Sequence, residues 1–145
     1  MTPDSNLLVS AYRADHPHHL VARQWLQETL TQAASGRTSL LLWDMVVVGF
    51  MRSTTDPQVF HQADTLLEAS GFVDHLLSRP GVQYQHQGPT WPHLQQRCLA
   101  LPPGGHGLGH AWLAAAVLQS GETLCTFDPC FEPLLPSEQL ILLKT

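Results

Sequence analysis

The sequence has few charged residues, and basic residues are the scarcer kind. Charged residues make up 13% of the 145 residues, about half the share usual in soluble domains. Twelve acidic residues against seven basic ones give a formal net charge of −5. The six arginines and Lys144 are scattered, so no basic run marks a DNA-binding arm or a polybasic membrane segment. Any contact with nucleic acid must therefore be local, since no overall field attracts it.

Cysteines and long apolar runs are also scarce. The three cysteines are an odd number without CxxC spacing, and the opening MTPDSN lacks the charged and apolar regions of a signal peptide. The longest apolar runs, Leu40 to Trp43 and Met45 to Met51, are separated by Asp44. Both fall far short of the ~20 residues that span a bilayer. We therefore expect a cytoplasmic protein without a membrane segment.

The apolar content, by contrast, is sufficient for one hydrophobic core. Hydrophobic residues make up 43% of the chain, and neither an internal repeat nor a low-complexity linker interrupts it. A stretch rich in proline and glycine, residues 102–109, is expected to be a loop between helices. The length suits one domain better than two, so we expect a single domain over residues 1–145.

Short apolar strands alternate with helices along the chain. Expected strands cover about residues 1–4, 38–42, 82–85, 123–126 and 140–143. Expected helices cover about residues 7–12, a segment capped by Asp15 and ended by Gly36, and residues 44–51, 63–77, 92–101 and 109–119. This alternation is typical of an α/β fold with a central, mainly parallel β-sheet flanked by helices on both faces.

Ligands of such sheets bind beyond the carboxyl ends of the strands. Three segments deliver polar residues there. Asp4 and Asn6 follow the first strand, a loop and helix start cover residues 106–110, and Thr126 and Asp128 follow the fourth strand. We expect these segments to meet at one edge of the sheet.

Four short stretches carry the most specific pattern of the chain. Residues 4–9 read DSNLLV, residues 49–52 read GFMR, residues 110–115 read HAWLAA and residues 126–131 read TFDPCF. In this order they resemble the D-x-N-v-L-v, E-F-L-R, D-A-x-L-A-A and T-x-D-x-D-F motifs of the PIN-domain ribonucleases. Within that family they resemble the VapC-type toxins of bacterial toxin–antitoxin pairs. The resemblance implies a PIN-like fold over residues 1–145.

The resemblance also implies a metal-dependent endoribonuclease. Clustered carboxylates in that family hold Mg²⁺ or Mn²⁺, which activates water and stabilises charge on the scissile phosphate. By this resemblance Asp4 and Asp128 are catalytic residues and metal ligands. Asn6 and Thr126 are positioning residues, and Arg52 lies near the phosphate of the substrate.

Three positions depart from the acidic pattern. Gly49, His110 and Cys130 stand where the family motifs carry acids. His110 is the third candidate for catalysis and metal binding. An imidazole is a poor ligand for Mg²⁺ and an acceptable one for Mn²⁺ or another transition metal, so this residue either changes the metal or abolishes the site. Asp44, five residues before Gly49, is expected on a different face of its helix, nearer the strand end.

Two functions remain open at this point. The first is a toxin-type endoribonuclease with an incomplete acidic site that binds Mg²⁺ or Mn²⁺ weakly, and the retained Asp4 and Asp128 favour it. The second is an inactive pseudo-toxin that binds an antitoxin or RNA, and Gly49 and His110 favour it. A structural role is also open, because Asp128 precedes Pro129 and can cap the next turn. The resemblance implies an RNA substrate, a VapB-like antitoxin and a homodimer.

Overall fold

The computed structural model describes residues 1–104 and 107–145. Strands and helices alternate along this part of the chain, as the sequence predicts. The elements are β1 (Thr2–Pro3), α1 (Ser5–Tyr12), α2 (His19–Ala34), β2 (Leu40–Trp43), α3 (Asp44–Thr54), α4 (Leu66–Leu77), β3 (Val82–Gln85), α5 (Trp91–Leu99), α6 (Leu108–Ser120), β4 (Leu124–Thr126), the 3₁₀ turns η1 (Pro129–Phe131) and η2 (Ser137–Gln139), and β5 (Leu140–Leu142).

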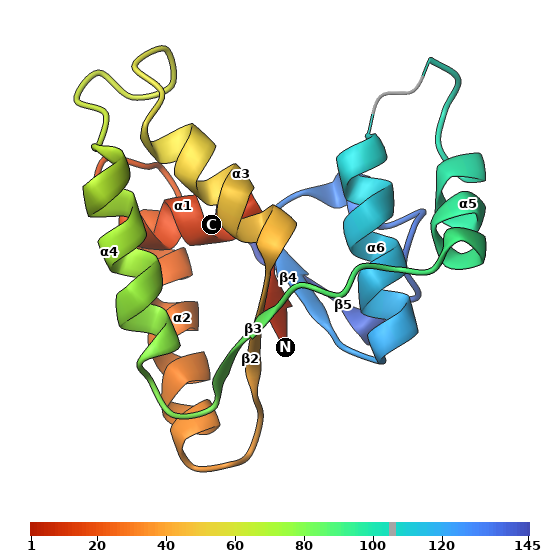
Figure 1. Ribbon diagram of the computed structural model, residues 1–145, viewed down its shortest axis with the longest axis horizontal. Helices are drawn as coiled ribbons and strands as arrows, with labels where there is room; N and C mark the ends of the chain where they lie inside the picture. The colour runs from red at the N-terminus through yellow and green to blue at the C-terminus, as the bar shows by residue number, and fades with distance from the viewer. Residues whose placement is uncertain (105–106) are drawn as a thin grey trace.

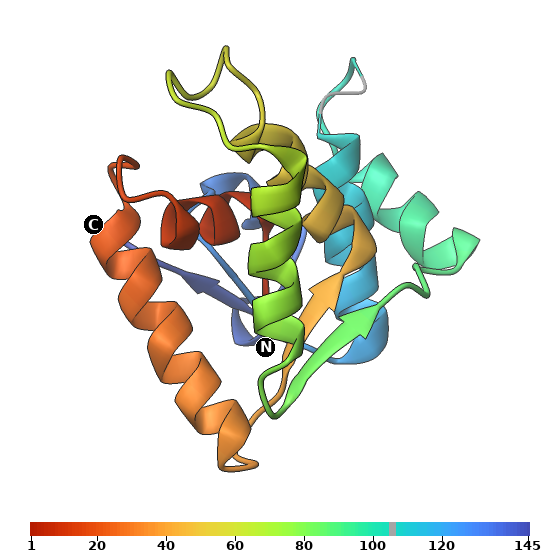
Figure 2. The ribbon, with the colours of Figure 1, turned by 60° about the vertical axis from the view of Figure 1, so that its left-hand side comes forward.

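The strands pair in parallel throughout. β4 lies between β1 and β5, and β2 pairs with β3, whose arrows run the same way in Figure 2. β2 reaches β1 through two hydrogen bonds. The Leu41 N–H donates to the Met1 carbonyl at 2.9 Å and the Thr2 hydroxyl donates to the Leu41 carbonyl at 2.8 Å. The strands form two parallel ladders, β1-β4-β5 and β2-β3, and these two bonds place β2 beside β1, on the side opposite β4. The carboxyl end of β1 is therefore the switch point where ligands of such sheets bind.

Helices cover both faces of the strands. In Figure 1, α1 to α4 lie on one side and α5 and α6 on the other. The small side chains of Ala111, Ala114 and Ala115 are fully buried, which allows α6 to approach the strands closely. This arrangement confirms the predicted α/β fold. Among the described helices, none combines the length and apolar character needed to cross a bilayer.

Three aromatic rings fix α3 against its neighbours. Phe50 of α3 is fully buried and contacts Tyr12 of α1 edge-on, with ring centroids 5.5 Å apart. Phe72 of α4 lies 5.3 Å from Phe50 and 4.7 Å from Tyr12. Aromatic pairs of this kind contribute about 0.5–1.5 kcal/mol each beyond their buried area. The cluster holds Gly49, which precedes Phe50, against α1.

The start of α2 differs from the prediction. The helix begins at His19 with His18 as its N-cap residue, and Asp15 does not cap it. The carboxylate of Asp15 instead accepts from the Arg13 guanidinium at 2.7 Å. A second branch of that guanidinium reaches Asp64 at 3.1 Å. The charge pairs outweigh the cap because an arginine offers a carboxylate two donors at once.

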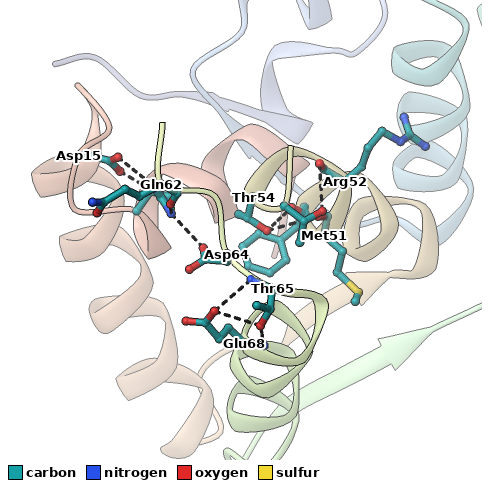
Figure 3. Close-up of polar contacts among 11 residues, drawn as sticks. Asp15, Met51, Arg52, Thr54, Gln62, Asp64, Thr65 and Glu68 are labelled. Carbon is teal, nitrogen blue, oxygen red and sulfur yellow. Dashed lines mark hydrogen bonds and ion pairs between the residues drawn. The ribbon is translucent and has the colours of Figure 1, made fainter. Parts of the chain in front are cut away.

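The start of α4 also differs from the prediction. The Thr65 hydroxyl accepts from the Glu68 N–H while the Glu68 side chain accepts from the Thr65 N–H, so the helix begins at Leu66 (Figure 3). This capping box sets the start of the helix later than the apolar pattern suggests. Leu66 and Leu67, in the first turn of α4, are 64% and 84% exposed.

Gly81 shapes the turn between α4 and β3. Its φ is +79°, and a Cβ there would lie 2.5 Å from the Ala33 carbonyl oxygen. We expect Gly81→Ala to lower the free energy of unfolding by about 2–4 kcal/mol. Gly36→Ala is the matched control, because Gly36 has φ +77° but an open surrounding, so only about 1–2 kcal/mol of conformational strain applies. Urea unfolding measures both, and equal losses would show that the approach to Ala33 is not limiting.

Candidate active site at the carboxyl end of β1

Asp4 is the buried acid of the site. It follows β1 directly and caps α1, with Oδ1 accepting from the Leu7 N–H at 2.8 Å. Oδ2 accepts from the Thr126 hydroxyl at 2.6 Å. Asp4 is only 5% exposed. Burial raises the pKa of its carboxyl above the ordinary value; the two hydrogen bonds oppose this, Asp128 adds to it and His110 opposes it weakly. The ionised form of Asp4 is therefore held in an unfavourable environment.

Thr126 connects the two retained acids. Its hydroxyl is fully buried at the end of β4, donates to Asp4 and accepts from the Asp128 N–H at 2.9 Å. One hydroxyl can do both because it has a donor and free lone pairs. The loop that carries Asp128 is thereby fixed beside the end of β1, the arrangement expected of a positioning residue.

Asp128 makes two contacts at once. Its Oδ1 accepts from the Cys130 N–H at 2.9 Å, so it caps η1, the structural role that the sequence left open. Its Oδ2 lies 3.2 Å from Nε2 of His110, in the first turn of α6. The His110 ring also packs edge-on against Phe131 at 4.7 Å. One nitrogen of the imidazole is thus already engaged inside the protein.

A cavity of about 410 Å³ brings four of the six predicted site residues together. Asp4 and Asn6 line it from the end of β1 and α1, Arg52 from α3 and His110 from α6. Thr126 and Asp128 do not line it. Thr126 instead donates a hydrogen bond to Asp4, and Asp128 contacts His110, so both hold residues that line the cavity.

Arg52 is the exposed cation of this cavity. Figure 3 shows its side chain extending away from the polar contacts around Asp64 and Thr65. Within residues 1–104 and 107–145, no carboxylate lies within salt-bridge distance of its guanidinium. An uncommitted guanidinium presents five donors in a planar fork, which suits a phosphate.

Ser5 is a site residue that the sequence reasoning missed. A Cβ on Gly49 would lie 2.3 Å from Ser5 Oγ and 3.0 Å from Ser5 Cβ. The Ser5 hydroxyl donates to the Val46 carbonyl at 2.9 Å. The place where the family motif carries an acid is therefore filled by α1. The D-S-N stretch places Ser5 beside Asp4, but nothing in the sequence pairs it with Gly49.

Asp44 does not take over the position of the missing acid. It lies at the start of α3, where its Oδ1 accepts from the Met45 N–H, and it is not among the cavity-lining residues. This agrees with its expected place nearer the strand end. His106, the other histidine of the predicted loop, lies outside the described residues.

The acidic residues as they lie do not fit a Mg²⁺ ion. Across residues 1–104 and 107–145, no three His, Cys, Asp or Glu side chains are grouped so as to hold a metal. The oxygens of Asp4 and Asp128 already accept protein hydrogen bonds, and His110 supplies nitrogen where Mg²⁺ prefers oxygen. A softer ion would require His110 to leave Asp128.

Several mycobacterial ribonucleases are similar in sequence to the chain. The VapC ribonuclease Mb2897 of Mycobacterium bovis is 31% identical over 129 residues, which cover 88% of this chain and 85% of that protein. Ribonuclease VapC43 of Mycobacterium tuberculosis gives the same values. Ribonuclease VapC31 of the same organism is 30% identical over 89 residues, covering 61% of this chain and 56% of that protein. No protein-family model matches the chain.

Proposed function

The chain belongs to the VapC ribonucleases, and from this premise we propose that it is a toxin-type endoribonuclease that cleaves RNA in the cavity around Asp4. The observation that carries the proposal is the convergence of Asp4, Asn6, Arg52 and His110 on one cavity from three separate stretches of the chain. These stretches resemble the family motifs, and the fold brings them to the switch point of the sheet.

Each polar side chain of the cavity has a separate proposed role toward the substrate. Arg52 binds the phosphate through its free guanidinium. Asn6, exposed on α1, offers both a donor and an acceptor to the neighbouring nucleotide. Asp4 is the proposed catalytic carboxylate, and Thr126 and the N-terminus of α1 hold it in place. The buried carboxylate near the bound phosphate is the group whose charge the reaction depends on most.

The proposed metal dependence follows from the donor set. Two carboxylates and an imidazole suit Mn²⁺ or another transition ion better than Mg²⁺. The proposed ligands are Asp4, Asp128 and His110, and the site is weak because these side chains are not grouped to hold an ion until His110 leaves Asp128. In the absence of the ion, His110 remains paired with Asp128.

Cleavage of a labelled mixed RNA pool tests the proposal. With Mn²⁺ we expect at least about tenfold faster cleavage than with Mg²⁺, because the imidazole favours the softer ion. Calorimetry is expected to show weaker binding of Mg²⁺ than of Mn²⁺. The Asp4→Asn variant in the same buffers is the control for contaminating nuclease. Absence of cleavage by the parent with every divalent ion would overturn the proposal, and micromolar Mg²⁺ binding would overturn the assignment of the metal.

A second candidate function has its own observations. The pairing of His110 with Asp128 and the filling of the Gly49 position by Ser5 both favour loss of catalysis. A pseudo-toxin of this kind would bind RNA or an antitoxin without cleaving RNA. Binding of the RNA pool without cleavage in any metal is the result that favours it.

We further propose a cytoplasmic homodimer that binds a VapB-like antitoxin. Leu66 and Leu67 of α4 are 64% and 84% exposed, and Val59, which precedes this helix, is 56% exposed. Large apolar side chains that are this exposed favour an interface with another chain. Light scattering is expected to give twice the 16.0 kDa mass of the chain. Leu67→Glu should shift the mass toward one chain. A mass of 16.0 kDa for the parent at every concentration would contradict the dimer.

A further inference from the structure

A second hollow adjoins the cavity of the proposed active site. It measures about 390 Å³ and is lined by His16, His18 and Phe127 together with Asn6 and Asp128. Asn6 lines both spaces, and Asp128 contacts His110 of the first cavity. A nucleotide beside a phosphate in the first cavity would therefore reach the second.

Flat rings form one wall of this hollow. The rings of His18 and Phe127 are stacked, with centroids 4.4 Å apart and planes 16° from parallel. His16 lies on His18 at 5.5 Å and 45°. All three side chains are half-buried, so part of each ring is accessible. Stacked rings of this kind are the surfaces on which proteins bind nucleobases.

The polar atoms of the hollow suit a base better than a phosphate. Nδ1 of His16 accepts from the His18 N–H at 3.1 Å, so a neutral His16 ring carries its proton on Nε2 and donates from there. Burial, and then His18, lowers the pKa of His16, so the ring is neutral at neutral pH. Asn6 adds an amide, and the Asp128 carboxylate repels a phosphate.

The His18 ring has no other structural task that the contacts reveal. His18 is the N-cap residue of α2, yet its side chain makes no capping hydrogen bond. Its Nδ1 is buried without a hydrogen-bond partner in the described part of the chain. A phenyl ring at this position would keep the stack on Phe127 without that unsatisfied nitrogen.

We propose that this hollow holds the base of the nucleotide next to the scissile phosphate, and that His16 and His18 select that base by stacking and hydrogen bonding. The inference rests on the proposed function, because it assigns the hollow to the same RNA chain. His16 and His18 are specificity-determining residues, and they act on the base rather than on the reacting phosphate.

Sequencing the ends of cleaved fragments from a random RNA pool tests the selection. For the parent we expect a base preference at one position flanking the cut. His18→Ala should weaken that preference and reduce cleavage at preferred sites by about 5- to 100-fold, the usual effect of losing one stacking ring. His18→Phe, which keeps a stacking ring, should restore most of the cleavage that His18→Ala loses, and His16→Gln should change which base is preferred. His75→Ala, an exposed histidine of α4, is the matched control without effect.

Binding of a short RNA with 2′-O-methyl riboses separates this inference from the proposed function. The 2′-O-methyl groups block attack by a 2′-hydroxyl, and a chelator in the buffer removes the metal that attack by water requires, so the affinity is measured without cleavage. An abasic nucleotide at the flanking position should lower the affinity of the parent about tenfold and leave that of His18→Ala unchanged. Base-dependent binding without cleavage of any RNA would support the assignment of the hollow to a base and contradict the proposal that the protein is a nuclease. The assignment of the hollow to a base would be overturned by cleavage with the same base preference in all variants. It would also be overturned if the variants differed from the parent only in melting temperature.

Discussion

The variant Ser5→Gly, Gly49→Glu, His110→Asp is expected to cleave RNA with Mg²⁺ at least about 100-fold faster than the parent. The proposed hydrolysis depends on a metal ion beside the scissile phosphate, and the variant adds two carboxylates that can bind Mg²⁺ in the cavity that Gly49 and His110 line. The aspartate at position 110 also stands in the first turn of α6, where the helix dipole favours a negative charge. Cleavage of the mixed RNA pool measures the gain.

Ser5 has to be replaced together with Gly49. A Cβ at position 49 would come within 2.3 Å of Ser5 Oγ, so Gly49→Glu alone must displace a side chain that donates to the Val46 carbonyl. We expect that single variant to melt lower and to gain no activity. Glycine at position 5 leaves room for the new side chain and keeps the backbone of α1.

The melting temperature of this variant is an independent measurement, because its carboxylates are crowded. Without metal the added negative charges repel one another, so the variant should melt below the parent, and Mg²⁺ should restore its melting temperature. Ser5→Gly, Gly49→Gln, His110→Asn is the matched control with the same shapes and no charge. If Mg²⁺ neither stabilises the acidic variant nor supports cleavage by it, then Gly49 and His110 are not the positions of the missing acids.

The fold class can be predicted from the sequence because short strands alternate with helices along the chain. Short strand-like segments between helices predict all five described strands, and the polar residues after β1 and at the end of β4 predict the edge where Asp4 and Thr126 meet. The expected helix over residues 63–77 starts too early, because a capping box at Thr65 and Glu68 decides where α4 starts. Local polar contacts of this kind override apolar periodicity at helix ends.

The details of the site depend on packing that no linear pattern contains. The contact between Ser5 and Gly49 exists because aromatic rings hold α3 against α1. The pairing of His110 with Asp128 requires α6 and the loop after β4 to meet, and their approach depends on the fully buried alanines of α6. The sequence identifies the residues that line the cavity, but their mutual contacts are set by the distances between helices.

Asp4→Asn is expected to abolish RNA cleavage, by at least about 100-fold, and at the same time to raise the melting temperature at pH 7.5 in the presence of a chelator. Burial raises the pKa of the Asp4 carboxyl in the folded protein above its ordinary value of 3.8. Between that value and the raised pKa, the folded state binds more protons than the unfolded state, so the stability of the parent falls as the pH rises through this window.

The melting temperature of Asp4→Asn is expected to rise because the amide of the new asparagine is neutral. An asparagine keeps the cap of α1, because its side-chain oxygen can accept from the Leu7 N–H, and it carries no charge to bury. The gap in melting temperature, about 2–4 °C for each kcal/mol gained, should be full above the raised pKa and close as the pH falls below 4. Asp74→Asn, on the exposed face of α4, controls for the exchange of carboxylate for amide. A variant that melts below the parent at every pH would show that the hydrogen bond from Thr126 to Asp4 outweighs the burial of its charge.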